Sequence, residues 1–129
     1  MNKENAKYLV EKFPVLYQDY GGDPRKTCMA WGFSCGDGWF DIIKELSEKL
    51  EPYGVVASQV KEKFGGLRFY VQSYPRESAD KIESYIQEAE EKSLRTCESC
   101  GAPGRPRGNG WITTLCNECM ENRSKKRLK

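Results

Sequence analysis

Four cysteines near the end of the chain constrain its fold more than any other feature. They form the pattern Cys-x2-Cys-x15-Cys-x2-Cys, at Cys97, Cys100, Cys116 and Cys119. Each Cys-x2-Cys pair is short enough to present two thiolates to one ion, and the intervening loop is long enough to bring the second pair back to complete a tetrahedron. Gly101 suits the tight turn after the first pair, and the β-prone run 111–115 leads into the second. The spacing predicts a zinc ion (Zn2+) bound in a zinc ribbon.

Two other chemistries also use four cysteines. Two disulfides would suit an exported domain, but residues 1–5 have no apolar stretch behind them, so a secretory signal is not expected. No apolar run approaches the length of a membrane span, and we expect a cytoplasmic protein. An iron–sulfur cluster stays open as the second alternative. Four thiolates leave no ligand position for an activated water, so the expected zinc is structural rather than catalytic.

Cys28 and Cys35 lie outside this pattern. Six residues separate them, which is a poor spacing for two ligands of one ion. We expect reduced, partly buried thiols, with a second metal site or a redox pair as the alternative.

The rest of the chain predicts an α+β fold. Helices are expected over residues 3–13, 38–50 and 78–93, with Asn2 and Asp37 as N-caps of the first two. A connection rich in Gly and Asp covers residues 17–37, and two strands, 55–64 and 67–74, flank a Gly65-Gly66 turn. We therefore expect helices packed on a β-hairpin, with a C-terminal zinc ribbon that uses four cysteine ligands. The expected division is 1–95 for the α+β domain with its central hairpin 55–74, 96–122 for the ribbon and 123–129 for a basic tail.

The hairpin is expected to have two chemically different faces. With Gly65-Gly66 as the turn, Lys63 faces Arg68, Lys61 faces Tyr70 and Gln59 faces Gln72. The face opposite these residues is mainly apolar and should pack on the helices, although Glu62 does not fit it. The polar face combines cations that bind phosphates, a ring that stacks on a base and amides that read base edges. It predicts a site for a nucleotide or a nucleic-acid strand, and an ordinary solvated sheet face is the alternative.

Three smaller groups of residues are further candidates. Asp37 and Trp39 form a second candidate cluster, or else a helix cap and a core tryptophan. Arg105 and Arg107 lie in the loop between the cysteine pairs, where they either clamp a phosphate or are simply exposed. Residues 97–129 carry 7 basic and 3 acidic side chains, and we expect the tail 123–129 to be frayed and solvated.

The chain contains no histidine, which argues against an enzyme. Without histidine there is no Ser-His-Asp or Cys-His pair and no His-based metal nuclease or phosphodiesterase.

The net charge is only +2, whereas proteins that bind duplex nucleic acid usually carry a much stronger positive field. The compact group of cations on the hairpin suits a small anionic ligand better than a long backbone.

Four segments of the chain form a recognisable set: Cys-Gly-Asp-Gly-Trp (35–39), Val-Lys-Glu-Lys-Phe-Gly-Gly-Leu-Arg-Phe-Tyr (60–70), Thr-Cys-Glu-Ser-Cys-Gly (96–101) and Gly-Trp-Ile-Thr-Thr-Leu-Cys (110–116). Together they resemble a family of small bacteriophage-encoded zinc-ribbon proteins. The resemblance covers about residues 30–120. The last ligand in that family is often His, and here it is Cys119, which keeps a complete ligand set.

The resemblance implies a phage accessory protein made in the cytoplasm of a bacterial host. Phage proteins of this size often counter host defence, sometimes by sequestering nucleotide signals. The expected function is therefore binding of a phosphate-bearing, nucleotide-type small molecule without catalysis. A nucleic-acid-binding zinc ribbon and a protein–protein adaptor that inhibits a host enzyme are the alternatives.

Overall fold

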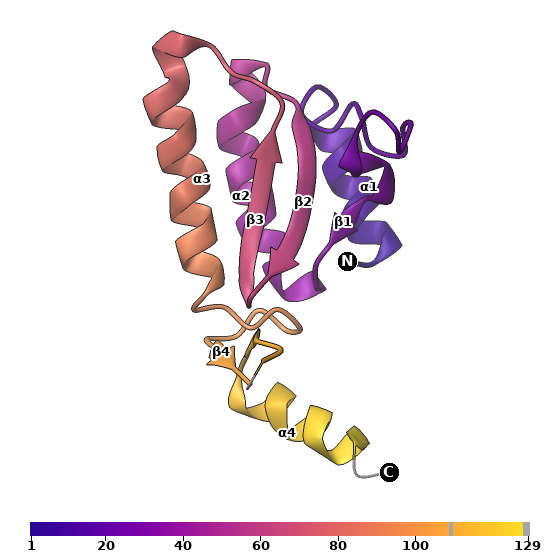
Figure 1. Ribbon diagram of the computed structural model, residues 1–129, viewed down its shortest axis with the longest axis vertical. Helices are drawn as coiled ribbons and strands as arrows, with labels where there is room; N and C mark the ends of the chain where they lie inside the picture. The colour runs from indigo at the N-terminus through magenta and orange to yellow at the C-terminus, as the bar shows by residue number, and fades with distance from the viewer. Residues whose placement is uncertain (109, 128–129) are drawn as a thin grey trace.

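The computed structural model describes residues 1–108 and 110–127 and has a mixed α+β architecture (Figure 1). Three helices, α1 (Lys3–Lys12), α2 (Phe40–Leu50) and α3 (Ala79–Ser93), pack with a sheet of order β1-β2-β3. Its strands are β1 (Phe33–Ser34), β2 (Ala57–Lys63) and β3 (Gly66–Val71). A two-stranded sheet follows, made of β4 (Arg105–Arg107) and β5 (Thr113–Leu115), and then α4 (Asn117–Arg127). The α+β class is confirmed, while the ribbon and the domain division stay predictions.

The helices bury one apolar stripe each. Asn2 caps α1 as expected, since its side chain accepts a hydrogen bond from the Asn5 backbone N–H at 2.8 Å. The buried residues of α2 include Ile43, Leu46 and Leu50, and those of α3 include Ile82. In Figure 1, α2 lies behind β3 and α3 runs to the left of it, so the strand face away from α2 is turned toward the viewer.

The connection over residues 17–37 contains more structure than expected. It includes β1, which pairs in parallel with β2 so that Phe33 lies beside Val60. Tyr17, Met29 and Phe33 from this part of the chain are buried in the core. The Tyr17 hydroxyl lies 2.6 Å from Ser47 Oγ, so this buried phenol has a hydrogen-bonding partner.

The hairpin turn was predicted one residue too late. The turn is Phe64-Gly65, with φ of 54° and 85°, and Lys61 pairs with Arg68 while Gln59 pairs with Tyr70. A two-residue turn of this kind needs positive φ at both central positions. Gly66 belongs instead to β3, where a Cβ would lie 3.2 Å from Leu94 Cδ2. Because the error moves each partner by two residues, the side chains of residues 59–63 and 67–71 keep their expected faces.

The two hairpin faces differ as expected, apart from changes near the strand ends. Val60, Leu67 and Phe69 are buried against the helices, whereas Phe64 is 66% exposed because it lies in the turn. A bulge between Ala57 and Gln59 puts Ala57 in the core.

Asp37 does not cap α2, so that prediction was wrong. A 3-10 turn, Asp37–Trp39, precedes the helix, and the first α-helical residue is Phe40. The Asp37 carboxylate instead accepts hydrogen bonds from the Asn2 backbone N–H at 2.7 Å and from Asn5 Nδ2 at 3.2 Å. Asp37 therefore fastens the start of α1 to the turn before α2.

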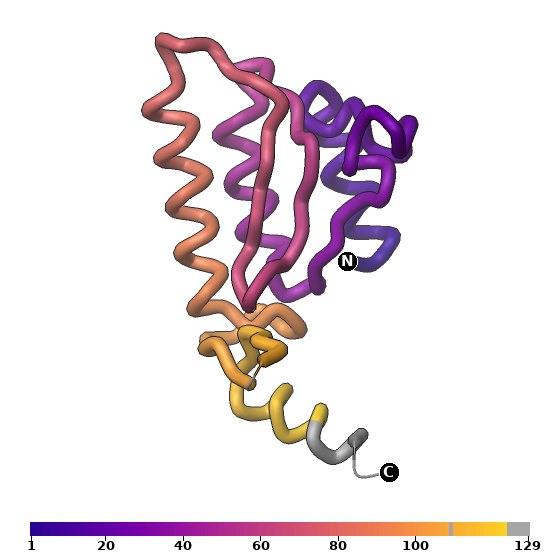
Figure 2. Tube along the Cα trace, in the orientation of Figure 1, coloured from indigo at the N-terminus to yellow at the C-terminus, as the bar shows by residue number. Residues whose placement is uncertain are grey.

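After the β2–β3 hairpin and α3, the chain enters the cysteine-containing segment, residues 96–119, which lies beyond the hairpin tip (Figure 2). The tail that was expected to be frayed continues α4 as far as Arg127, and residues 128–129 of that prediction lie outside the described residues. Within residues 1–108 and 110–127, no helix combines the length and the apolar character needed to span a lipid bilayer.

Candidate functional site

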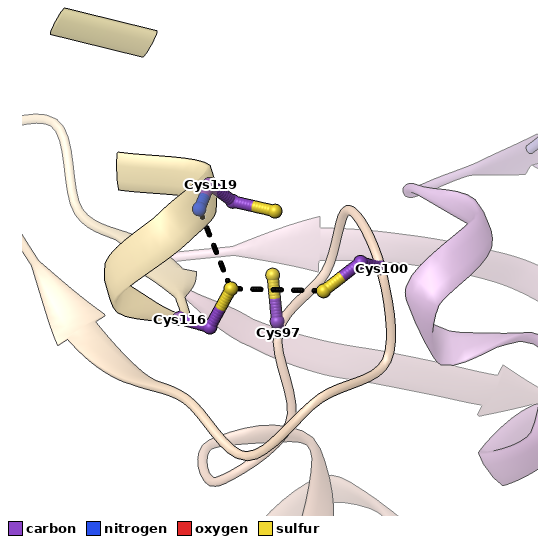
Figure 3. A group of neighbouring side chains, drawn as sticks. All are labelled: Cys97, Cys100, Cys116 and Cys119. Atoms are coloured by element: carbon purple, nitrogen blue, oxygen red, sulfur yellow. Dashed lines mark hydrogen bonds between the residues drawn. The ribbon is translucent and has the colours of Figure 1, made fainter. Parts of the chain in front are cut away.

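The four cysteine side chains converge on one point. Cys97 and Cys100 come from the loop after α3, Cys116 follows β5 and Cys119 lies in the first turn of α4 (Figure 3). Their four sulfur atoms all lie within 4.8 Å of one another, and Cys100 Sγ is 3.6 Å from Cys116 Sγ. Zinc–sulfur bonds of about 2.3 Å in a tetrahedron put the sulfur atoms about 3.8 Å apart. The group therefore has the size of a four-thiolate metal site.

Backbone hydrogen bonds fix both cysteine pairs. The Gly101 N–H donates to the Cys97 carbonyl at 2.9 Å, and the Met120 N–H donates to the Cys116 carbonyl at 3.0 Å. Gly101 has φ of 84°, a conformation that a residue with a Cβ rarely adopts. Antiparallel pairing of β4 with β5, which includes Arg105 beside Leu115, brings the second pair back to the first.

The pKa values of the clustered thiols are shifted in opposite directions by their surroundings. Burial raises the pKa of Cys97, but backbone N–H groups of Cys116, Cys100 and Ser99 outweigh it and lower the pKa to about 7. At Cys119 the pKa is raised, chiefly by its hydrogen bond with the Cys116 sulfur and then by burial. Four neighbouring sulfur atoms repel one another as thiolates, so full ionisation of the group requires a bound cation.

The segment Cys-Gly-Asp-Gly-Trp packs directly on the first cysteine pair. The Gly38 N–H donates to the Glu98 carbonyl at 2.7 Å, and the Gly36 N–H donates to Glu98 Oε2 at 2.8 Å. A Cβ on Gly38 would lie 2.1 Å from the Cys97 carbonyl oxygen, so only glycine permits this approach. Trp39 is fully buried, and its Nε1 donates to the Thr96 carbonyl at 2.8 Å. The motif therefore joins α2 to the cysteine-containing segment.

The hairpin turn makes the second contact with this segment. Thr114 Oγ1 donates to the Gly65 carbonyl at 2.5 Å, and a Cβ on Gly65 would lie 3.0 Å from Ile112 Cγ2. The Glu62 carboxylate accepts the Gly65 N–H at 2.7 Å. This bond explains why an acidic side chain occupies the otherwise apolar face of the hairpin.

The polar face of the sheet brings four of the predicted ligand-binding residues together. Register places Ser34, Lys61 and Arg68 side by side across β1, β2 and β3, and puts Gln59 beside Tyr70 in a neighbouring row. Tyr70 is 43% exposed, and the Lys61 and Arg68 side chains form no ion pair within the described residues. Ser34 was not predicted, because a two-residue parallel strand shows no alternation of apolar and polar residues.

Two predicted members of this face are placed differently. Gln72 lies beyond the end of β3, where its Nε2 donates to Asp19 Oδ2. Lys63 is the last residue of β2, and its Nζ lies 5.6 Å from the centre of the Phe64 ring. Both side chains therefore have partners within the fold.

The remaining candidates lie outside the sheet face. Arg107 Nε donates to the Leu115 carbonyl at 3.0 Å and its terminal nitrogen donates to Asn117 Oδ1, so Arg107 links β5 to the start of α4. Arg105 is exposed on β4, and both arginines line a shallow hollow of about 400 Å³.

The two cysteines outside the metal-site pattern differ in exposure. Cys35 is buried, which raises the pKa of its thiol to about 12, whereas Cys28 is exposed. Cys28 is therefore not the partly buried thiol that was expected, and none of the six cysteines forms a disulfide in the structure.

Comparison with known proteins adds no further information about this site. No protein-family model, curated protein sequence or solved structure matches the chain.

Proposed function

We propose that Cys97, Cys100, Cys116 and Cys119 bind one zinc ion as the structural centre of a zinc ribbon. The supporting observation is the set of four sulfur atoms within 4.8 Å of one another, on two backbone turns that are already formed. Thiolate sulfur is a preferred ligand of zinc, and four of them close the coordination shell. Gly38 and Gly65 pack against the cysteine-containing segment, so a metal that orders this segment also stabilises the positions of α2 and of the hairpin.

Metal analysis of the purified protein tests this proposal. We expect one zinc per chain and a colourless protein, and we expect Cys119→Ser to lose the ion. Cys28→Ser is the matched control, because Cys28 is exposed and lies outside the cluster. Visible absorption from an iron–sulfur cluster, or full zinc content in Cys119→Ser, would contradict the assignment.

We propose that the sheet face bearing Gln59, Lys61, Arg68 and Tyr70 binds a phosphate-bearing, nucleotide-type ligand. One observation carries this proposal: Lys61 and Arg68 are adjacent, lack ion-pair partners within the described residues and lie next to an exposed tyrosine. Two neighbouring cations without a counter-charge produce a positive potential that an anion relieves. The planar guanidinium of Arg68 matches two phosphate oxygens, and the Tyr70 ring offers a surface for a base.

Binding is proposed to leave the ligand unchanged. The chain has no histidine to act as a general base, and the proposed zinc has a closed shell of four thiolates. Its resemblance to small phage proteins supports sequestration of a nucleotide signal of the host as the purpose of binding. This role requires affinity but no turnover.

Isothermal titration calorimetry with a panel of nucleotides tests the sheet-face proposal. Loss of one charge-assisted hydrogen bond costs about 1.5–3 kcal/mol, so Arg68→Ala should weaken binding roughly 10- to 150-fold. Arg76→Ala is the matched control, because Arg76 is an exposed arginine in the turn before α3. Mass spectrometry of the recovered ligand should show no conversion. Binding that survives loss of both Arg68 and Tyr70 would leave this face as a solvated sheet surface.

The adaptor alternative is supported by a different observation. Phe64 and Trp111 are 66% and 75% exposed, and they line the same hollow of about 220 Å³ near the hairpin tip. Exposed aromatic side chains are typical of protein interfaces. If no nucleotide and no oligonucleotide binds the intact protein, this surface becomes the preferred candidate.

A further inference from the structure

A loop beside the polar sheet face carries additional cations toward Tyr70. Residues 23–28 are held in a compact turn, in which the Arg25 N–H donates to Asp23 Oδ1 at 2.9 Å and the Lys26 N–H donates to the Asp23 carbonyl at 2.9 Å. Thr27 Oγ1 lies 3.5 Å from the Ser58 carbonyl of β2, so the loop contacts the sheet. The loop is therefore placed at one end of the face that the proposed function uses.

The loop and the sheet together line a hollow of about 550 Å³. Arg25 and Lys26 line it on the loop side, and Gln59 and Tyr70 line it on the sheet side. Gln59 and Tyr70 are thus shared between the hollow and the polar face described above. The hollow continues the candidate site past the tyrosine ring, away from Lys61 and Arg68.

The charges in the loop are not equivalent. Arg25 Nε lies 3.3 Å from Asp23 Oδ1, so the guanidinium is partly neutralised by that carboxylate. Lys26 is exposed and forms no ion pair in the described part of the chain. Lys26 is therefore the loop side chain with its full charge available for a ligand.

The site consequently has cations at both ends of one aromatic ring. Tyr70 and Gln59 lie two residues along the strands from Arg68 and Lys61, which corresponds to about 7 Å. The loop lies beyond Tyr70, beside Ser58. A ligand that stacks on Tyr70 therefore meets positive charge in two directions rather than one.

We propose that this face recognises a nucleotide unit with phosphates on both its 3′ and 5′ oxygens, one phosphate held by Lys61 and Arg68 and the other by the loop at Lys26. Such a unit occurs in nucleoside bisphosphates and in phosphodiester-linked nucleotides. A chain of phosphates on one oxygen places all its charge on one side of the base and satisfies only one of the two groups of cations. This assignment rests on the proposed nucleotide-binding function and specifies the ligand class for the same site.

Calorimetry at constant salt with three adenosine ligands tests the assignment. Adenosine 3′,5′-bisphosphate and ADP carry the same number of phosphates in different places, and AMP carries one. We expect the bisphosphate to bind about 10-fold or more tightly than ADP, because it gains a second charge-assisted contact. A 3′-phosphorylated dinucleotide, tested beside the bisphosphate, distinguishes a free nucleotide from a phosphodiester-linked one as the source of the unit.

Two variants locate the two phosphate positions. Lys26→Ala should weaken bisphosphate binding about 10-fold and change AMP binding less than twofold. Arg68→Ala should instead weaken the binding of all three ligands. Lys81→Ala on α3 is the control for loss of an exposed lysine, and thermal melting verifies that each variant is folded.

The outcomes separate this inference from the function on which it rests. Equal affinity for ADP and the bisphosphate, or a Lys26→Ala variant that binds the bisphosphate as tightly as the wild type, overturns the two-phosphate assignment and leaves nucleotide binding intact. Failure of all the ligands to bind a folded protein overturns both.

Discussion

Replacing Gly38 with alanine tests whether the Cys-Gly-Asp-Gly-Trp segment depends on close approach to the cysteine-containing segment. The added Cβ would lie 2.1 Å from the Cys97 carbonyl oxygen, so the two backbones must separate by on the order of 1 Å to reach ordinary contact. That movement breaks the bonds from Gly38 N–H and Gly36 N–H to Glu98, and the bond from Trp39 Nε1 to Thr96. Two neutral bonds and one to a carboxylate are together worth about 3–5 kcal/mol.

The loss should appear in both stability and metal retention. Urea unfolding followed by circular dichroism should show Gly38→Ala destabilised by about 3 kcal/mol or more, with Tm lowered by about 10 °C. A chromogenic chelator should remove the metal faster from this variant. Gly54→Ala is the control, because a Cβ there meets no atom within 4 Å and only the positive φ of 71° is strained, at about 1 kcal/mol. A Gly38→Ala variant no less stable than Gly54→Ala would refute the reasoning.

Three further outcomes are expected. Ser93→Ala should lower the unfolding free energy by about 1–3 kcal/mol in urea titrations, because it leaves the buried Leu67 N–H without its acceptor at 2.8 Å. Thr114→Val should weaken the link between the hairpin turn and β5, which faster hydrogen exchange of the hairpin-tip amides would reveal. Burial of Tyr17 raises its pKa above the ordinary value of 10, so the folded state keeps a proton that the unfolded state releases. Stability should therefore fall as the pH rises above about 10, by up to about 1.4 kcal/mol per pH unit, and less steeply in Tyr17→Phe.

The sequence predicted the elements that carry periodic patterns or strong local signals. Burial of one face gives α2 and α3 an apolar stripe and gives β2 and β3 an alternation of apolar and polar residues. Both patterns can be read directly from the sequence. The clustering of the four cysteines was predictable because a shared metal site would require a short spacing within each pair. Strand β1 was missed, because two residues in parallel pairing leave no alternation to detect.

Other features could not be predicted because the partners are distant in the sequence. The one-residue error in the turn arose because a Gly-Gly pair is the stronger local turn signal, whereas the observed turn puts Phe64 at positive φ and leaves Gly66 in β3, close to Leu94. Similarly, nothing near Asp37 indicates that its carboxylate binds the N–H of Asn2 instead of capping α2. In both cases a tertiary contact overrides a local preference.

The glycine contacts give the cysteine-containing segment a role beyond its own stability. Gly38 contacts Cys97 and Glu98, so the start of α2 is supported by the first cysteine pair. Gly65 contacts Thr114, so the β2–β3 hairpin is supported by β5, the strand that leads to Cys116. Lys61 and Arg68 are the third residue pair from the hairpin turn, whose Gly65 carbonyl accepts a hydrogen bond from Thr114. Because a bound metal contributes its binding free energy to folding, removing it should loosen the hairpin end first. Ligand binding at the proposed sheet-face site is therefore expected to weaken when the proposed metal is removed, although none of the four clustered cysteines contributes a side chain to that face.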